Sequence, residues 1–317
     1  MTLAGCATLA PAPAPVEIKI VAFNDFHGNL EPPRQSVETS AVEGVSARVP
    51  AGGAAYLASA IDSLRAANPN HIVVSAGDMI GATPLVSALF LDEPTIHAMN
   101  RIGVDLNAAG NHEFDKGRAE LLRMQNGGCA QHGLRKPCQL EPFPGARFGL
   151  LAANTVTEDG TTLFPPYAIR SFGSGASKVR VGFIGLTLEA TPALVTPAGI
   201  AGLSFRDEAD TVNALIPRLR AEGVDAIILL IHEGATTTGR YNDKQCAGLA
   251  GDLPPILDRL DPAIDIVVSG HTHRAYVCDY GRINPARPFL LTSAGSAGTM
   301  LSDITLTIDP RTRAVVA

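Results

Sequence analysis

Aromatic residues are scarce in this sequence: tryptophan is absent, and aromatic residues make up only 5% of the 317 positions. The chain therefore offers no evident platform on which nucleic-acid bases could stack. Acidic residues outnumber basic ones by 31 to 25, and the resulting formal net charge of −6 argues against a groove for a nucleic-acid polymer. A small phosphate ester is still compatible with this charge, because bound metal cations would dominate the local field.

Long apolar runs and closely spaced cysteine pairs are also missing. No apolar run approaches the ~20 residues that a transmembrane helix needs. No Cys-x-x-Cys pair occurs, which disfavours a cysteine-based metal site. With 46% hydrophobic and 18% charged residues, the chain can bury a substantial core. We see no internal repeat and no later linker, and we predict a leader at 1–16 followed by one domain at 17–317.

The N-terminal segment resembles the leader of an exported protein. Leu3-Ala4-Gly5-Cys6 matches the end of a bacterial lipoprotein signal, although the basic and apolar parts of such a signal do not precede it. Residues 10–15 alternate Ala and Pro, which is typical of an extended tether. We therefore expect a periplasmic or cell-envelope protein. Membrane attachment through a lipidated Cys6 is one alternative, and a chance match is the other.

Four further cysteines lie in segments rich in turn-forming residues. An even count in such segments suggests two disulfides and an oxidising compartment. We predict the pairs Cys129–Cys138 and Cys246–Cys278. Four free thiols in a cytosolic protein are the alternative, which the N-terminal segment disfavours.

Apolar segments typical of buried strands alternate with segments of helical periodicity. This alternation predicts an α/β fold in which helices cover both faces of the sheet. Residues 31–50 are polar without a period and predict a long surface loop. Strands are expected at 17–23, 71–75, 105–109, 149–154, 179–186, 225–231, 264–269, 289–292 and 301–308, and helices at 52–67, 85–90, 94–102, 115–124, 207–222 and 253–260.

Five of the expected strands end in side chains that can bind a metal ion or move a proton. Strand ends are where α/β folds place their sites. Carboxylates with imidazoles suit Zn²⁺, Mn²⁺ or Fe²⁺ better than Mg²⁺ or Ca²⁺. Because a single structural zinc closes at four ligands, the count favours two metal ions that share one carboxylate, and Asp78 between two glycines is the natural bridge. The residues are Asp25 and His27; Asp78; Asn111 and His112; His232; and His271 and His273.

Together these motifs resemble the calcineurin-like metallophosphatases, and more closely the bacterial 5′-nucleotidase/UDP-sugar hydrolase branch. The resemblance covers about residues 17–317. It implies a four-layer α/β/β/α sandwich of two mixed sheets flanked by helices. It also implies a two-metal phosphoesterase that hydrolyses nucleotides or related phosphate esters. The matching segments are Asn24-Asp25-x-His27-Gly28, Gly77-Asp78, Gly110-Asn111-His112-Glu113, His232 and Gly270-His271-x-His273.

The resemblance further implies a role for each residue. His112 would face the phosphate with its ring oriented by Asp115, and as an imidazolium it would stabilise phosphoryl charge or protonate the leaving oxygen. A metal-bound hydroxide would attack phosphorus, and Glu113 would support the site from behind. In some nucleotidases the position of His273 is Gln. One metal ion would be held by Asp25, His27, Asp78 and His273, and the other by Asp78, Asn111, His232 and His271.

Several alternatives stay open at this level. Asn111 is also compatible with a left-handed turn and His232 with a packed core histidine, while His71, His97 and His132 lie away from the strand ends. The chain stops about where the nucleoside-binding domain of the two-domain nucleotidases would begin, so the binding surface could come from the 31–50 segment, the 129–138 loop or a partner. A cyclic-nucleotide phosphodiesterase, a thiosulfohydrolase-like enzyme and a non-catalytic metal-bound lipoprotein are therefore alternatives.

Overall fold

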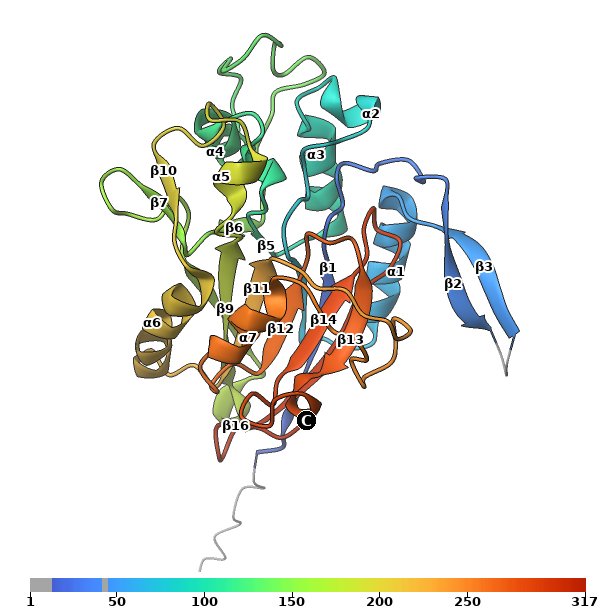
Figure 1. The fold of residues 1–317 in the computed structure, drawn as a ribbon, viewed down its shortest axis with the longest axis vertical. Coiled ribbons are helices and arrows are strands. Elements are labelled where there is room, and N and C mark those ends of the chain that lie inside the picture. Colours follow the sequence, from blue (N-terminus) through green and yellow to red (C-terminus); the bar gives the residue numbers. More distant parts are fainter. Residues whose placement is uncertain (1–12, 42–44) are drawn as a thin grey trace, which may run out of the picture.

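Two six-stranded sheets face each other in the computed structural model, which describes residues 13–41 and 45–317 (Figure 1). Cys6 and the lipoprotein-like motif lie outside the described residues. The first sheet has the order β16 (Ala314–Val315), β15 (Ser302–Asp309), β1 (Val16–Phe23), β4 (His71–Ser75), β5 (Leu106–Ala108), β6 (Gly149–Leu151). The second has the order β13 (Ala275–Asp279), β14 (Leu290–Ala294), β12 (Ile266–Ser269), β11 (Ala226–His232), β9 (Val179–Thr187), β8 (Tyr167–Phe172).

Both sheets are mixed, as expected. In the first, β1, β4, β5 and β6 run parallel, and β15 pairs antiparallel with β1. In the second, β9, β11, β12 and β14 run parallel, and the edge strands β8 and β13 are antiparallel. The carboxyl ends of parallel strands lie at one edge of a sheet, so this topology brings the predicted strand-end residues to a common edge of each sheet.

Alternation along β1 shows how the layers form. Ile18 and Ile20 pack between the two sheets, whereas Val21 and Phe23 pack under the helices on the outer face. The helices α1 (Ala54–Ala66), α3 (Glu93–Ile102) and α4 (Arg118–Asn126) cover the first sheet, and α6 (Glu208–Ala221) and α7 (Leu253–Arg259) cover the second. The four-layer α/β/β/α architecture is therefore confirmed. Within the described residues, no helix is both long and apolar enough to cross a membrane.

The prediction of a loop at 31–50 was wrong. The structure has a hairpin there, with β2 (Gln35–Ala41) paired antiparallel to β3 (Val45–Ala51), and it projects from the body of the molecule (Figure 1). The alternation is incomplete here: Val45, Ala47, Val49 and Ala51 alternate with other residues along β3, but in β2 only Val37 and Ala41 are apolar. Hydrogen bonds along the backbone can hold such a ribbon without that pattern.

Other differences concern short or edge elements. The helix expected from 115 begins only at Arg118, because residues His112–Phe114 form a separate 3₁₀ turn. Strands β8 and β13 were not predicted, since each is an edge strand with partly exposed side chains. The remaining short elements are β7 (Thr155–Thr157), which pairs with β10 (Leu203–Phe205), α2 (Leu85–Ala88), α5 (Thr191–Leu194), and 3₁₀ turns at Gly175–Ser177 and Tyr280–Arg282.

Both predicted disulfides are present. Cys129 and Cys138 close a loop between α4 and β6, with Cα atoms 5.5 Å apart. Cys246 bonds Cys278 on β13, with Cα atoms 5.1 Å apart. These Cα separations are normal for disulfides.

Breaking the Cys246–Cys278 disulfide should lower the free energy of unfolding by about 3–4 kcal/mol, because the bond closes a long loop in the unfolded chain. The cysteines are 32 residues apart, compared with nine for Cys129 and Cys138. Removal of the shorter bridge should cost about 2–3 kcal/mol. Urea denaturation of the two paired Cys→Ala variants measures both losses. A larger loss from the shorter bridge would contradict this account.

Candidate active site

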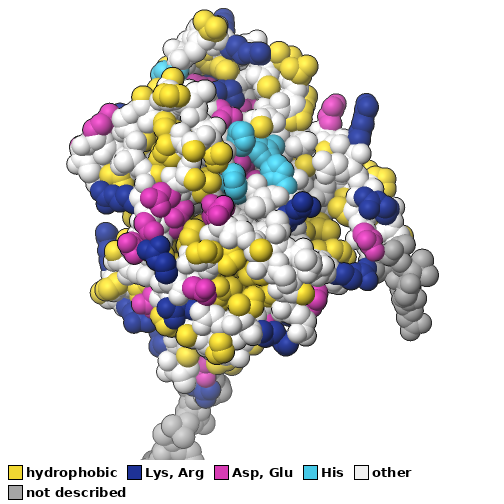
Figure 2. Space-filling view, viewed as in Figure 1, with side chains coloured by type: hydrophobic (Ala, Val, Ile, Leu, Met, Phe, Trp, Pro, Cys, Tyr) yellow, Lys and Arg dark blue, Asp and Glu magenta, His cyan; other side chains and the backbone are white. Residues whose placement is uncertain are grey.

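Polar side chains from both sheets meet where the parallel strands end. They follow β1, β4 and β5 in the first sheet and β11 and β12 in the second. Figure 2 shows the histidines gathered in one place on the surface of this face. The structure therefore brings the predicted strand-end residues together, although they are up to about 250 positions apart in sequence, as in the contact of His27 with His273, 246 positions apart.

Asp25, His27 and His273 form one group of potential metal ligands. Nε2 of His27 lies 3.1 Å from Nε2 of His273. Oδ1 of Asp25 lies 3.7 Å from the first of these nitrogens and 3.3 Å from the second. This oxygen is buried and, among the described residues, has no hydrogen-bond partner. A buried carboxylate oxygen that faces two imidazole nitrogens suits a bound cation.

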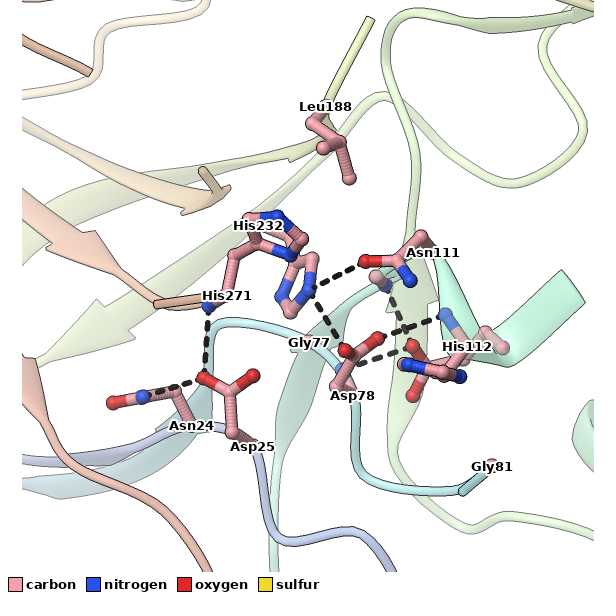
Figure 3. A network of polar contacts seen from close by, with 12 residues as sticks. Asn24, Asp25, Gly77, Asp78, Gly81, Asn111, His112, Leu188, His232 and His271 are labelled. Carbon is pink, nitrogen blue, oxygen red and sulfur yellow. Dashed lines mark hydrogen bonds and ion pairs between the residues drawn. The ribbon is translucent and has the colours of Figure 1, made fainter. Parts of the chain in front are cut away.

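Asp78, His232 and His271 form the second group. Nε2 of His232 lies 3.0 Å from Oδ2 of Asp78 and 3.2 Å from Oδ1 of Asn111, and Figure 3 shows these three side chains directed at one another. The same Oδ2 of Asp78 is 3.7 Å from Nε2 of His27, which belongs to the first group. Asp78 therefore lies between the two groups, where a bridging carboxylate would be.

Backbone carbonyls orient two of the imidazole rings. Nδ1 of His27 lies 2.9 Å from the carbonyl oxygen of Gly81, and Nδ1 of His232 lies 2.8 Å from that of Ala76. A carbonyl oxygen only accepts, so in each ring the proton belongs on Nδ1. When the ring is neutral, Nε2 then directs its lone pair into the cluster, which is the arrangement that metal-binding histidines adopt.

The backbone at the cluster has unusual conformations. Five of the seven proposed ligands have left-handed φ values between 47° and 69° although none is glycine. Such values are rare for non-glycine residues and concentrate at functional sites. Asn111 is not among them: its φ is −71°, which is right-handed, so the left-handed turn alternative was wrong. The five residues are Asp25, His27, Asp78, His271 and His273.

Two glycines allow the chain to approach these side chains closely. A Cβ atom at Gly77 would lie 2.5 Å from Nδ1 of His232, and one at Gly270 would lie 3.0 Å from Oδ2 of Asp25. Gly77 also has a φ of +92°, which side chains rarely tolerate. The glycines that precede Asp78 and His271 in the sequence are thus required by the packing of the site.

His112 and Asp115 lie beside the two groups. Nδ1 of His112 donates to Oδ2 of Asp115 at 2.8 Å, which leaves Nε2 free to face a substrate. The backbone N–H of His112 donates to Oδ1 of Asp78 at 2.9 Å. The ring centroids of His112 and His27 are 5.2 Å apart. About a third of the side-chain surface of both His112 and Asp115 is exposed, so a substrate can reach them.

Asn24 and Glu113 hold the strand ends in place. The Asn24 side chain donates to Oδ2 of Asp25 at 2.6 Å and to the carbonyl of Gly295 at 2.7 Å, and thereby connects the two sheets. Buried Glu113 accepts hydrogen bonds from the backbone N–H groups of Asp78, Met79 and Gly110. The sequence analysis assigned no role to Asn24; its position next to Asp25 in the motif was the only available signal.

The pKa values in the cluster reflect opposing effects. Burial alone would lower the pKa of both His27 and His232. The nearby carboxylates of Asp25 and Asp78 instead raise that of His27 to about 9, and Asp78 raises that of His232 to about 10. Burial raises the pKa of Asp25, but the imidazoles of His27 and His273 beside its Oδ1 bring it below the ordinary range. Burial and the charge of His232 lower the pKa of His271.

Metal affinity should therefore rise with pH. Both raised pKa values exceed the ordinary histidine value of about 6.5, so near neutral pH a divalent ion that used His27 and His232 as ligands would have to displace their protons. Their protonation stabilises the metal-free fold fully below about pH 6.5, and this contribution is lost as the pH rises through about 9 to 10. Mn²⁺ titration calorimetry between pH 6 and 9 tests the affinity, and thermal melting of the metal-free protein tests the stability. A pH-independent affinity would contradict this reasoning.

His71, His97, His132 and Arg240 lie outside the cluster. Nδ1 of His71 contacts the carbonyl of Asn68, and His97 packs edge-on against Phe143, so both have local packing roles. Arg240 pairs with Glu38 of the projecting hairpin at 3.4 Å. His132 lines a separate pocket.

Comparisons with known proteins agree with the fold and the motifs. A family model described as calcineurin-like phosphoesterase matches residues 18–275. The "Cell wall protein Lmo0130" of Listeria monocytogenes is 33% identical over 94% of this chain and 38% of its own length. The snake venom 5′-nucleotidase of Gloydius brevicauda is 31% identical over 84% of this chain and 39% of its own length.

A solved structure agrees as well. The NAD nucleotidase of Haemophilus influenzae superposes with a TM-score of 0.68 at 23% identity, over 96% of this chain and 49% of that one. The present chain thus spans about two fifths of the length of the two curated relatives and about half of this structural neighbour. At this identity the neighbour supports the fold alone.

Proposed function

Because this chain belongs to the calcineurin-like phosphoesterase family, we propose that it is a two-metal phosphoesterase of the 5′-nucleotidase type. Its substrates would be nucleotides or related small phosphate esters. The observation that carries this proposal is the pair of ligand groups with Asp78 between them and the His112–Asp115 pair beside them. The similarity to a named 5′-nucleotidase supports the choice of substrate class.

The residues divide into two metal sites. Asp25, His27 and His273 would hold one divalent ion, and His232, His271 and Asn111 the other, with Asp78 shared. Imidazole and carboxylate donors suit Zn²⁺, Mn²⁺ or Fe²⁺. When bound, such ions supply electrophilic stabilisation of phosphoryl oxygens and an activated water. The buried, unpartnered Oδ1 of Asp25 fits this assignment.

His112 would act on the reacting phosphate. Its Nδ1 proton is held by Asp115, so Nε2 is the atom that faces the substrate. The Asp115 hydrogen bond raises the pKa of His112, which favours the imidazolium form. In that form Nε2 donates to a phosphoryl or leaving oxygen and can transfer its proton to the departing alkoxide. Asp115 would keep the ring in the required orientation throughout.

We also propose that the protein acts in the periplasm or elsewhere in the cell envelope. Its two disulfides favour an oxidising compartment, and a relative is named a cell wall protein. Anchoring through a lipidated Cys6 belongs to this proposal. Incorporation of labelled palmitate in cells, compared between the natural chain and Cys6→Ala, tests the anchor.

A substrate panel tests the proposed activity. The metal-stripped protein is reloaded with Mn²⁺ or Zn²⁺ and assayed for phosphate release from AMP, UDP-glucose, 2′,3′-cyclic AMP and 4-nitrophenyl phosphate. A coupled monoesterase is added for the second and third substrates, whose first cleavage frees no phosphate. Preferential hydrolysis of AMP is the expected result. Preference for the cyclic nucleotide would instead indicate a phosphodiesterase, and metal binding without any turnover would indicate a non-catalytic protein.

A further inference from the structure

A pocket that the proposed mechanism does not use lies between α2, α4 and the loop closed by the Cys129–Cys138 disulfide. Its volume is about 430 Å³, and its wall includes Lys116, the residue that follows Asp115. Pockets for small ligands span roughly 300–1,000 Å³, so part of a nucleotide-sized molecule fits. The pocket is lined by Ala88, Leu91, Lys116, His132, Leu134 and Arg135, among others. We call it the Lys116–Arg135 pocket.

One wall of the pocket is fixed through a buried carboxylate. Asp92 is fully buried and accepts hydrogen bonds from the hydroxyls of Thr83 and Ser87, at 2.7 and 2.9 Å. It also pairs with the ammonium group of Lys116. The turn that follows α2, which contributes Leu91, is thereby tied to the residue beside Asp115.

The other wall is the loop closed by the Cys129–Cys138 disulfide. The backbone N–H of Cys138 donates to buried Glu93 at 3.0 Å, and Glu93 also pairs with Arg123 of α4 at 2.7 Å. Nε2 of Gln139 donates to the carbonyl of Leu89 at 3.1 Å, which joins the loop to α2. These contacts hold the end of the loop against α2 and α4 before any ligand binds, which reduces the entropic cost of ordering this wall.

The charged side chains of this pocket that have no partner of opposite charge are basic. Lys116 is paired with Asp92, and Glu120, which also lines the pocket, accepts two hydrogen bonds from Arg123. Among residues 13–41 and 45–317, Arg135 and His132 have no partner in an ion pair or a side-chain hydrogen bond. Figure 2 shows basic and apolar side chains side by side at the upper end of the molecule, where this loop lies (Figure 1). Leu134 is fully exposed there.

We propose that the Lys116–Arg135 pocket binds a second phosphate group, carried by the leaving-group part of the substrate. This inference rests on the proposed phosphoesterase function. The pocket is connected to the site through the chain, because Lys116 in its wall directly follows Asp115. The guanidinium of Arg135 matches a phosphate group in charge and geometry. Leu91 and Leu134 provide apolar surface for the sugar or base between the two phosphates.

A matched pair of substrates tests the pocket. AMP and adenosine 3′,5′-bisphosphate share the 5′-phosphate and differ only in the second phosphate. We expect the natural protein to prefer the bisphosphate, and Arg135→Ala to lower the ratio of kcat/KM for bisphosphate over AMP by about tenfold, as expected for loss of a charged hydrogen bond. The loss should appear mainly in KM, because contacts far from the reacting phosphate act on binding.

Lys136→Ala is the matched control, because Lys136 is the next cation along the loop and does not line this pocket. It should leave the substrate ratio unchanged. In a second measurement, calorimetry in the metal-loaded His112→Asn background gives the Kd of the bisphosphate with and without Arg135→Ala, and about tenfold weaker binding is expected. The Kd measurement tests binding in the pocket even if the protein hydrolyses neither nucleotide. A lack of turnover would count against the proposed function and not against the pocket. An unchanged ratio together with an unchanged Kd would overturn the proposal.

Discussion

Asp78→Asn should abolish turnover and metal retention together. Oδ2 of Asp78 lies within 3.7 Å of His27 in one ligand group and 3.0 Å of His232 in the other. The substitution keeps the size of the side chain and an oxygen that can accept from the N–H of His112, but it removes the charge that both metal ions would share. We expect at least about a thousandfold lower kcat/KM, on the scale of losing metal-ion catalysis.

Metal content, measured by plasma mass spectrometry, should fall from two ions per chain to one or none in this variant. Asp105→Asn is the matched control. Its carboxylate also accepts a backbone N–H, that of Val73 at 2.8 Å, but it lies at the opposite end of the strands from the cluster. The control should keep both metal content and activity. Full turnover in Asp78→Asn would contradict the proposed bridge.

His112→Asn should lower kcat by about 10²–10⁴-fold while metal content stays unchanged. His112 belongs to neither ligand group, and its ring contacts Asp115. If it protonates the leaving oxygen, the loss should be much larger for AMP than for 4-nitrophenyl phosphate, whose leaving group needs no proton. His97→Asn, a histidine packed against Phe143 away from the site, is the control. Loss of metal from His112→Asn would show that His112 is a ligand.

The pH dependence provides a second test of His112. The hydrogen bond from His112 to Asp115 raises the pKa of the imidazole, so removing this carboxylate should lower that pKa. Activity that requires the imidazolium is lost as the pH rises through its pKa. In Asp115→Asn, the alkaline limb of the kcat profile should therefore move to lower pH. An unmoved limb would mean that another group sets it.

The elements that carry the site were predictable because local signals agreed with the fold. The apolar runs before Asp25, Asp78, His232 and His271 are buried strands, and the same pattern of an apolar run followed by a possible ligand recurs at each of them. The structure also explains the glycines at 77 and 270, because a Cβ atom there would lie too close to the side chains of His232 and Asp25. The two disulfides followed from four cysteines in turn-rich segments.

Other features leave no local trace in the sequence. The hairpin β2–β3 was missed because its apolar alternation is largely confined to one strand, β3. Periodicity does not say which strand joins which sheet, so the meeting of β1, β4 and β5 with β11 and β12 depended on the family resemblance. The left-handed backbone at His27 and His273 is imposed by tertiary contacts rather than by residue type. The contact of Asn24 with Gly295 across the two sheets is equally non-local.

The central claim is that this strand-end cluster is a two-metal phosphoesterase centre, and a stepwise metal titration tests it most directly. The metal-stripped protein is given increasing equivalents of Mn²⁺, and bound metal and AMP hydrolysis are measured on the same samples. The account predicts no activity in the stripped protein and activity that reaches its plateau as the second equivalent binds, because Asp78 joins the two groups. Full activity without metal, or no hydrolysis of any phosphate ester with both ions bound, would contradict it.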